Sequence, residues 1–202
     1  MRERTVPTVE DIELVGGRLC LDFANTANWL DGAPIDERLN TYSDLVGWGR
    51  RQGLIDRTTE ARLNEQARCD AAASEEALVS AVRLRDANWR IFSRTGDATD
   101  IAQLNAALAL PGPRLSERSA GAVWVPPVGD LGAWLLHPVA ASAAELLTSP
   151  VRPRVKSCPG DRCGWVFLDG SPSGRRRWCS MATCGNRRKA RAHYSRRRAG
   201  ER

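Results

Sequence analysis

Four of the six cysteines lie close together near the carboxyl-terminal end of the 202-residue chain. They form two pairs, Cys158 with Cys163 and Cys179 with Cys184, with four residues inside each pair and fifteen between the pairs. Two such pairs can bring four thiolates to the corners of a tetrahedron, which is the geometry of a closed structural zinc site. The spacing therefore predicts that these cysteines bind one structural zinc ion.

Two other interpretations of the cysteines stay open. They could be reduced thiols without a metal, or they could form two disulfides in a secreted domain. Export is not indicated, because the first residues contain neither an apolar core nor a small-residue cleavage site. His193 could replace one ligand, although four cysteines already complete the set. A complete set leaves no open position for a metal-activated water, which disfavours a catalytic zinc.

Positive charge is concentrated in the same part of the chain. Residues 151–202 contain 15 of the 30 Lys and Arg residues but only three acidic residues, a formal charge of +12, whereas the first 150 residues carry −6. A strongly basic segment attached to a mildly acidic one is typical of a protein with a polyanionic partner. The alternative is a solvated basic tail without a specific partner.

The basic residues after Cys184 have helical spacing. We predict a helix over residues 186–198, in which residues three or four positions apart share one face. A helix fixed at its start by zinc and covered with guanidinium groups suits phosphates and guanine edges in the major groove of DNA. Arginines 175–177 could clamp the neighbouring backbone. The candidate nucleic-acid contacts are Arg175, Arg176, Arg177, Arg187, Arg188, Lys189, Arg191, Tyr194 and Arg198.

Between the two cysteine pairs, the sequence predicts a hairpin. Residues 165–168 alternate as a strand, residues 169–174 have turn composition, and residues 175–179 can return beside the strand. Its aromatic side chains are expected to pack around the zinc rather than to stack on unpaired bases. These aromatic residues are Trp165, Phe167 and Trp178.

The first 150 residues predict a mainly helical body. Helices are expected over 44–52 after a Ser43 cap, from 58 or 59 to about 72, from Ser74 to Gly96, over 101–108, and from about 130 to 148 with a kink at Pro138. Residues 122–125 are predicted to form a strand paired with the segment around Leu115, and residues 18–23 a short strand.

These elements predict an α+β chain of two domains: a mainly helical domain over 1–150 and a small, basic, treble-clef-like ββα zinc module over 151–202. About 150 residues can bury roughly two-thirds of their surface, so the body should fold without a metal. The last 52 residues contain few aliphatic side chains and need the metal to hold them together. No apolar run approaches the roughly 18 residues of a membrane-spanning helix, and we expect a cytoplasmic protein without a membrane partner.

Two segments resemble known families. Arg177-Trp178-Cys179-Ser180-Met181, followed by Cys184-Gly185-Asn186-Arg187, resembles the CGNR zinc finger, which is named for that stretch of four residues. The segment 16–26, GGRLCLDFANT, resembles the opening of the ABATE domain, which commonly precedes this finger in bacterial proteins. The resemblance implies a bacterial DNA-binding regulator of transcription under stress, with the four cysteines as metal ligands. It also implies that the body senses a signal or contacts a partner.

Several side chains of the body could serve either structure or function. Asp22 and Asn25 could touch a ligand, but we expect them to bond to the backbone beside a turn. Cys20 and Cys69 are expected to be small buried hydrophobes rather than redox sensors. The tryptophans should build the core, with an effector pocket lined by tryptophan as the alternative. They are Trp29, Trp48, Trp89, Trp124 and Trp134.

The sequence therefore predicts a zinc-dependent protein that binds duplex DNA and regulates transcription. RNA binding and a zinc-stapled protein-interaction module are the alternatives, the first requiring exposed aromatic residues. An enzyme is not expected, since the chain contains no nucleophile elbow, phosphate-binding loop, dinucleotide-binding motif or metalloprotease motif. We also expect a small-molecule effector on the body, and a homodimer, because one short helix touches few bases.

Overall fold

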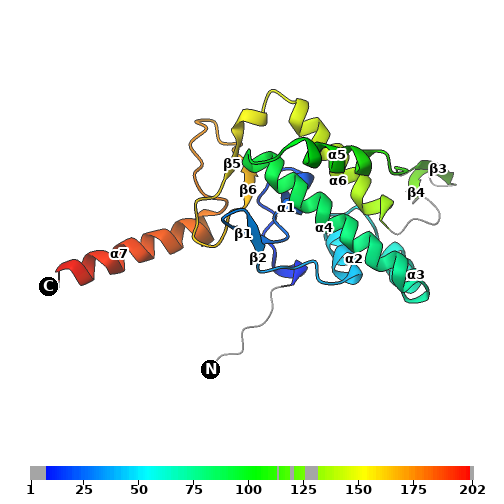
Figure 1. Cartoon of the computed structure of the whole chain (residues 1–202), viewed down its shortest axis with the longest axis horizontal. Helices are drawn as coiled ribbons and strands as arrows, with labels where there is room; N and C mark the ends of the chain where they lie inside the picture. Colours follow the sequence, from blue (N-terminus) through cyan, green and yellow to red (C-terminus); the bar gives the residue numbers. More distant parts are fainter. Residues whose placement is uncertain (1–7, 113, 119–120, 126–131, 201–202) are drawn as a thin grey trace.

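The computed structural model describes residues 8–112, 114–118, 121–125 and 132–200. Helices dominate this part of the chain, accompanied by short two-stranded sheets. Figure 1 shows α1 to α6 gathered into a body, with α7 projecting away from it at one end. The predicted α+β class is confirmed, with a mainly helical body followed by a four-cysteine module of two short strands and a helix.

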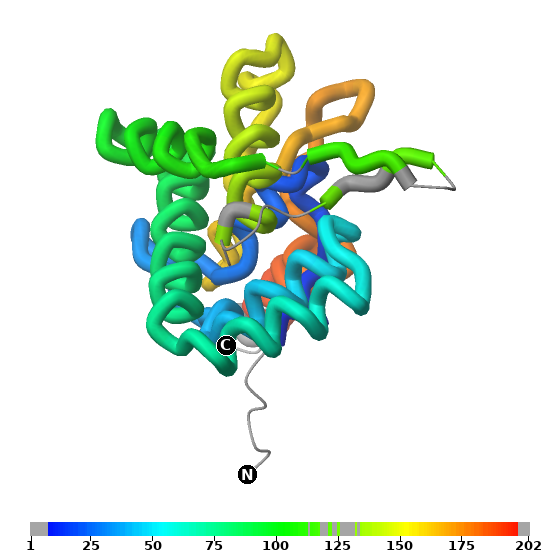
Figure 2. Tube along the Cα trace, turned by 90° about the vertical axis from the view of Figure 1, so that its right-hand side faces the viewer, coloured from blue at the N-terminus to red at the C-terminus, as the bar shows by residue number. Residues whose placement is uncertain are grey.

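In the part of the body that the structure describes, there are six α-helices and two hairpins. The helices are α1 (Leu19–Ala24), α2 (Tyr42–Arg51), α3 (Arg57–Cys69), α4 (Ala71–Ser93), α5 (Ala98–Leu108) and α6 (Ala133–Thr148). The antiparallel hairpins pair β1 (Asn28–Leu30) with β2 (Ala33–Ile35), and β3 (Arg114–Arg118) with β4 (Gly121–Val125). The long helix α4 packs against α1, α2 and α5, and Figure 2 shows it along one flank of the body.

Side chains that cap the helices fix where they begin. The Thr41 hydroxyl accepts a hydrogen bond from the Asp44 amide at 3.2 Å, and the Asp44 carboxylate accepts one from the Thr41 amide at 2.8 Å. This reciprocal box starts α2 ahead of the predicted cap Ser43, which has an apolar residue three positions after it and cannot form a box. Asp70 similarly caps α4 ahead of the predicted Ser74.

The strand predicted over residues 18–23 is wrong, because this segment forms helix α1. Cys20, Leu21 and Phe23 are all fully buried. A helix buried on every side shows no amphipathic period, so its sequence lacks the usual helical signal. Pro138, where a kink is predicted, lies within helix α6, which extends on both sides of it.

The zinc module begins with β5 (Val155–Ser157) and β6 (Val166–Leu168), and ends with a π-helical turn (Met181–Gly185) and α7 (Asn186–Gly200). The strands are antiparallel, with Val155 opposite Leu168. The prediction that residues 175–179 return beside β6 is wrong, since β5 takes that place and residues 175–179 are irregular. The turn between β5 and β6 therefore brings Cys158 and Cys163 together.

One apolar core continues from the body into the zinc module. Val155, Val166 and Phe167 are buried in the same cluster as the side chains of α1 and α4, and the four cysteines lie in it as well. The side chain of Trp124 lies outside the described residues. The other predicted core tryptophans are all buried: Trp29, Trp48, Trp89 and Trp134.

Candidate zinc site and nucleic-acid interface

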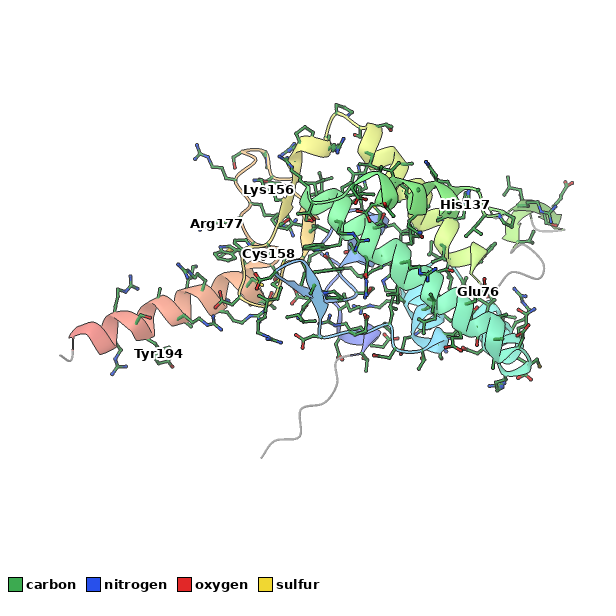
Figure 3. The ribbon with its side chains drawn as sticks, viewed as in Figure 1. Glu76, His137, Lys156, Cys158, Arg177 and Tyr194 are labelled. Atoms are coloured by element: carbon green, nitrogen blue, oxygen red, sulfur yellow. The ribbon has the colours of Figure 1, made fainter. Side chains whose placement is uncertain are left out.

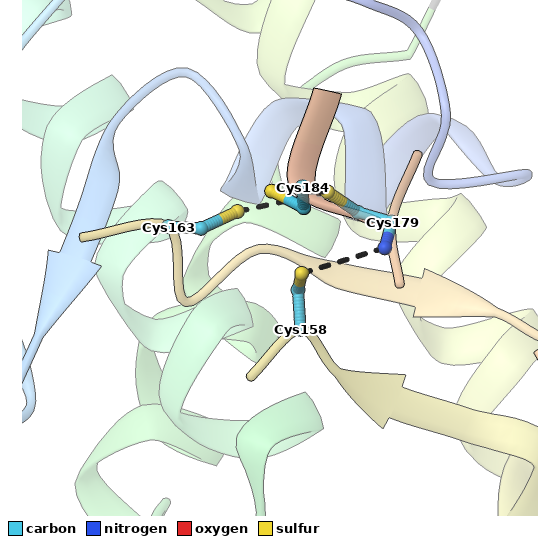
Figure 4. A group of neighbouring side chains, drawn as sticks. All are labelled: Cys158, Cys163, Cys179 and Cys184. Carbon is cyan, nitrogen blue, oxygen red and sulfur yellow. Dashed lines mark hydrogen bonds between the residues drawn. The ribbon is translucent and has the colours of Figure 1, made fainter. Parts of the chain in front are cut away.

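The four predicted ligands converge on one point from two parts of the module. Cys158 follows β5 and Cys163 precedes β6, whereas Cys179 precedes the π-helical turn and Cys184 lies within it. All four are buried, and their Sγ atoms lie within 4.8 Å of one another. Figure 4 shows the four thiol groups facing a common centre.

The sulfur spacing fits a zinc ion. The Sγ atom of Cys179 lies 3.6 Å from that of Cys163 and 3.6 Å from that of Cys184. A tetrahedron with Zn–S bonds of about 2.3 Å has edges of about 3.8 Å, whereas a disulfide requires about 2.05 Å. The cysteines are free thiols. The chain thus carries a site for one structural zinc ion. This ion would cross-link the segment between β5 and β6, residues 158–165, to the start of α7. We call this segment the zinc knuckle.

Nearby groups shape the site. The Cys179 amide donates to Cys158 Sγ at 3.4 Å, and Arg187 Nη2 donates to Cys184 Sγ at 3.5 Å. Hydrogen bonds from the Cys163 and Cys179 thiols hold the pKa of Cys158 well below its usual range. A Cβ atom on Gly160 would lie 2.8 Å from Cys184 Sγ. Glycine at this position therefore leaves room for the ligand sulfur.

The segment that resembles the ABATE opening attaches the module to the body. Asn25 Nδ2 donates to Val166 O at 2.9 Å, and the Val166 amide donates to Asn25 Oδ1 at 2.9 Å. The Leu168 amide donates to Gly16 O at 2.8 Å. Asp22 Oδ1 accepts from the Gly16 amide at 2.8 Å. The prediction that Asp22 and Asn25 bond to the backbone is confirmed.

The zinc knuckle itself also contacts the body. The Trp29 amide donates to Cys163 O at 2.9 Å, and Trp89 Nε1 donates to Gly164 O at 2.8 Å. Gly164 has a φ of +60°, and a Cβ atom there would lie 2.6 Å from Trp29. Trp165 Nε1 donates to Ala27 O at 3.0 Å. These buried contacts fix the module against β1 and α4.

Arg176, a predicted nucleic-acid contact, has its guanidinium turned inward. It donates to the carbonyl oxygens of Val15, Leu168, Trp178 and Cys179, and lies 4.4 Å from the centre of the Phe167 ring. Sequence reasoning missed this role, because three adjacent arginines look alike in a sequence.

The neighbouring residues of that loop are held by a second cluster. Lys156 Nζ donates to Asp169 Oδ2 at 2.7 Å, and Asp169 also accepts from the Ser171 and Arg176 amides. The Lys156 ammonium, followed by Ser171, holds the pKa of Asp169 far below its usual range. Arg175 and Arg177 remain exposed, and the Arg177 guanidinium lies 5.4 Å from the centre of the Trp178 ring.

The predicted contacts on α7 are brought together on one projecting helix. The side chain of Arg198 lies outside the described residues. Figure 3 shows Tyr194 near the outer end of α7 and Arg177 on the loop nearer the body. His193 is exposed on α7 and stands apart from the cysteine cluster. The exposed residues of this set on α7 are Arg187, Arg188, Lys189, Arg191 and Tyr194.

An acidic side chain that sequence reasoning missed faces this helix. Asp161, in the zinc knuckle, forms an ion pair with Arg191. The sequence does contain a signal for this pair, since Asp161 is one of only three acidic residues after position 150.

Of the two cysteines of the body, Cys20 is buried and burial raises its pKa to about 12, as expected of a small hydrophobe. The prediction that Cys69 is buried is wrong, because it lies exposed at the end of α3.

Comparison with known families agrees with the residues described above. Residues 17–150 match the ABATE family, described as "Putative stress-induced transcription regulator", and residues 154–197 match the CGNR zinc finger. No match was found among curated proteins. In the part of the chain that the structure describes, no helix has the length and apolar character needed to cross a membrane. The chain belongs to the ABATE family and carries a CGNR zinc finger with four cysteines close enough to hold one zinc ion.

Proposed function

We propose that this protein binds duplex DNA through α7 and the exposed arginines of its zinc module, and thereby regulates transcription. The observation that carries the proposal is α7 itself. Its first turn is held by the cysteine cluster, and its described side chains beyond that turn are exposed to solvent. A basic helix of this kind fits the major groove, where arginine reads guanine and binds phosphate.

The proposed contacts divide into two groups. Arg187, Arg188 and Arg191 would face the groove from α7, with Lys189 and Tyr194 beside them, and Arg198 is kept as a contact on the sequence alone. Arg175 and Arg177 would contact the backbone from the loop of the module. Arg176 supports this loop through its carbonyl partners. We propose that residues 151–202 bind the nucleic acid and that the body, 1–150, supplies signal recognition and a dimer contact.

The aromatic residues favour duplex DNA over single-stranded RNA. Recognition of single strands uses exposed rings on which bases stack. Trp165 is only 8% exposed and donates its indole N–H to Ala27 O. Trp178 is half-buried, with Arg177 over its ring. The Trp165 ring therefore offers no free face for an unpaired base, and Arg177 covers one face of Trp178, so a single strand would depend on Tyr194 of α7, which is 67% exposed.

Selection of bound sequences from a random duplex library, with the zinc-loaded full-length protein at physiological salt, tests the proposal. An enriched motif is the expected result, and a palindromic motif would support a dimer. The Arg187→Ala/Arg188→Ala variant should reduce the slope of log K against log salt by about 1.8, at about 0.9 per phosphate contact. The matched control is Arg57→Ala/Arg83→Ala, which removes two exposed arginines of the body.

Three outcomes would contradict the proposal. They are an absence of enrichment, an unchanged salt slope in the α7 variant, and tighter binding to single strands than to duplexes. The last two would favour a protein-interaction module and an RNA-binding protein, respectively.

A further inference from the structure

A hollow lies where the end of α4, the turn Arg152–Arg154 and the loop before Cys179 meet. One part, of about 650 Å³, reaches the zinc module, and an adjoining part, of about 840 Å³, reaches α5 and α6. Both are lined by Phe92, Arg94, Pro153 and Val155, so the two parts adjoin. Small-molecule sites in proteins have volumes of about 300–1,000 Å³. The hollow is therefore large enough for a small organic ligand.

The wall shared by the two parts is apolar. Phe92 and Val155 line both parts but are only 4% and 5% exposed. The apolar surface open to a ligand comes from Pro153 and, on the side of the body, from Ile101 and Leu147. Ile101 is 42% exposed, so much of its side chain is open to a ligand. A ligand with an apolar ring would cover these side chains.

The rim is cationic, and its charges are of two kinds. Lys156 and Arg176 already hold carboxylate or carbonyl partners within the module. The single carboxylate among the described lining residues is Asp97, which accepts hydrogen bonds from the Thr99 and Asp100 amides at the start of α5. Four exposed arginines remain to face a ligand: Arg94, Arg152, Arg175 and Arg177.

Arg94 stands at the centre of this arrangement. It lines both parts of the hollow and ends α4 with a φ of +69°, a left-handed conformation that glycine adopts more readily. Its one hydrogen bond to the module is a long contact of 3.5 Å from Nη2 to Pro153 O. The forked guanidinium has five N–H donors and matches a carboxylate in two parallel bonds. The remaining donors of Arg94 are suited to an acid in the hollow.

We propose that this hollow binds a small organic acid with one or two apolar rings. Its carboxylate would pair with Arg94 and Arg152, and its rings would lie on Pro153, Ile101 and Leu147. Such a ligand would touch the end of α4 and the zinc module at once. It would thus occupy the boundary between the body and the part of the chain that carries α7.

A regulatory consequence rests on the proposed DNA binding. Arg175 and Arg177 line the hollow and also belong to the proposed backbone contacts. A bound acid would neutralise part of the positive charge that attracts phosphate. DNA binding and acid binding would then oppose each other, and by linkage each would weaken the other by the same factor.

Calorimetric titration of the zinc-loaded full-length protein, without DNA, tests the site directly. The probe is 2-naphthoate, and its uncharged analogue 2-naphthamide serves as the control ligand. We expect one saturable site for 2-naphthoate and binding of the amide at least about tenfold weaker, as expected for the loss of a charge-assisted pair. The Arg94→Gly variant keeps a backbone suited to the left-handed conformation and should bind 2-naphthoate about tenfold more weakly.

Arg83→Ala serves as the control, since Arg83 is exposed on α4 away from the hollow, and it should bind like the unsubstituted protein. Amide resonances of Gly96, Ser157 and Arg177 should shift with the acid. Equal binding of acid and amide, or full affinity in Arg94→Gly, would overturn the site. Acid binding with unchanged DNA affinity would overturn the competition alone. A protein that binds the acid but no duplex DNA would refute the proposed function and leave the site supported.

Discussion

Asn25 in the body and Val166 in the zinc module exchange two hydrogen bonds of 2.9 Å through the side-chain amide of Asn25. The amide group thus occupies the open edge of β6 as a neighbouring strand would, while β5 pairs with the other edge. Asn25 is fully buried, so water cannot replace either bond. This pair joins the two parts of the chain at a distance of 141 residues in sequence.

Asn25→Ala should therefore destabilise the protein strongly. The change leaves the Val166 amide and carbonyl buried without these partners, which costs about 2–4 kcal/mol. Urea unfolding of the zinc-loaded protein measures the loss. Asn105→Ala, at an exposed position of α5, is the matched control and should change stability by less than about 0.5 kcal/mol. Equal effects of the two substitutions would contradict the assigned role of Asn25.

Removing the zinc should lower the melting temperature of the body as well as that of the module. The sequence alone suggested that the body folds independently of the metal. However, Trp29, Trp89 and Ala27 bond to the knuckle that the zinc closes. Calorimetry with and without a chelator should show one shared transition that shifts. Two transitions, of which only one responds to the chelator, would contradict the coupling.

Alanine substitutions of the adjacent residues Arg175 and Arg176 should have different effects on stability and on DNA binding. Arg176→Ala removes the donors to four carbonyl groups and should cost at least about 3 kcal/mol, since each hydrogen bond to a charged group contributes about 1.5–3 kcal/mol. Arg175→Ala should leave stability within about 0.5 kcal/mol and reduce the salt slope of DNA binding by about 0.9. Chemical unfolding and DNA titration separate the two roles, and the reverse pattern would refute them.

Asp161→Asn should strengthen DNA binding. The Asp161 carboxylate pairs with Arg191 and repels phosphate near α7. Since exposed ion pairs contribute about 0–1 kcal/mol, we expect a gain of about twofold to fivefold in affinity at physiological salt. Glu65→Gln, which removes an exposed ion pair with Arg68 on the body, should leave the affinity unchanged. Weaker binding of Asp161→Asn would show that Asp161 positions Arg191 productively.

Asp22 should contribute a gain in stability as the pH falls from 7.5 to 5.5. Burial raises the pKa of Asp22 from 3.8 to about 6, against the opposing effect of the Gly16 amide and the charges of Arg176 and Arg51. Because the folded state binds this proton more tightly than the unfolded state, protonation favours folding. One pKa unit corresponds to about 1.4 kcal/mol, which gives a gain of about 1 kcal/mol over this range. The range from pH 7.5 to 5.5 lies above the pKa of the other perturbed carboxylates, which are all shifted downward: Asp11, Glu37, Asp56 and Asp169.

Asp22→Asn isolates this effect. The amide oxygen can still accept the hydrogen bond from the Gly16 amide, but the side chain no longer titrates. The variant should be more stable than the unsubstituted protein at pH 7.5, and its stability should vary less between pH 7.5 and 5.5. Thermal melting of both proteins with zinc bound provides the test. An equal pH dependence in the two proteins would assign the effect to another group.

The metal site could be predicted because its ligands are local in sequence. Cys158 with Cys163 and Cys179 with Cys184 each lie on one short turn, so their spacing alone implies the geometry. The strand partner of β6 could not be found in this way. Residues 155–157 and residues 175–179 were both near enough to pair, and the choice depended on contacts with the body.

The attachment of the module to the body was also outside the reach of sequence reasoning. Asn25 carries the polarity of a surface or turn residue, and its burial follows from the position of Val166. Gly164 gave no periodic signal, although a side chain there would collide with Trp29. Tertiary contacts of single residues leave no pattern in one sequence.

The close approach of Gly164 to Trp29 would have a consequence for the proposed recognition of operators. A finger joined to its body by a flexible linker can adjust to different arrangements of target sites. Here Cys163 and Gly164 are held against Trp29 and Trp89, so the direction of α7 relative to the body would be set before any DNA arrives. A dimer formed through the body would present two such helices at one separation and one angle. Target sites would then be selected by the spacing of their half-sites as sharply as by their bases.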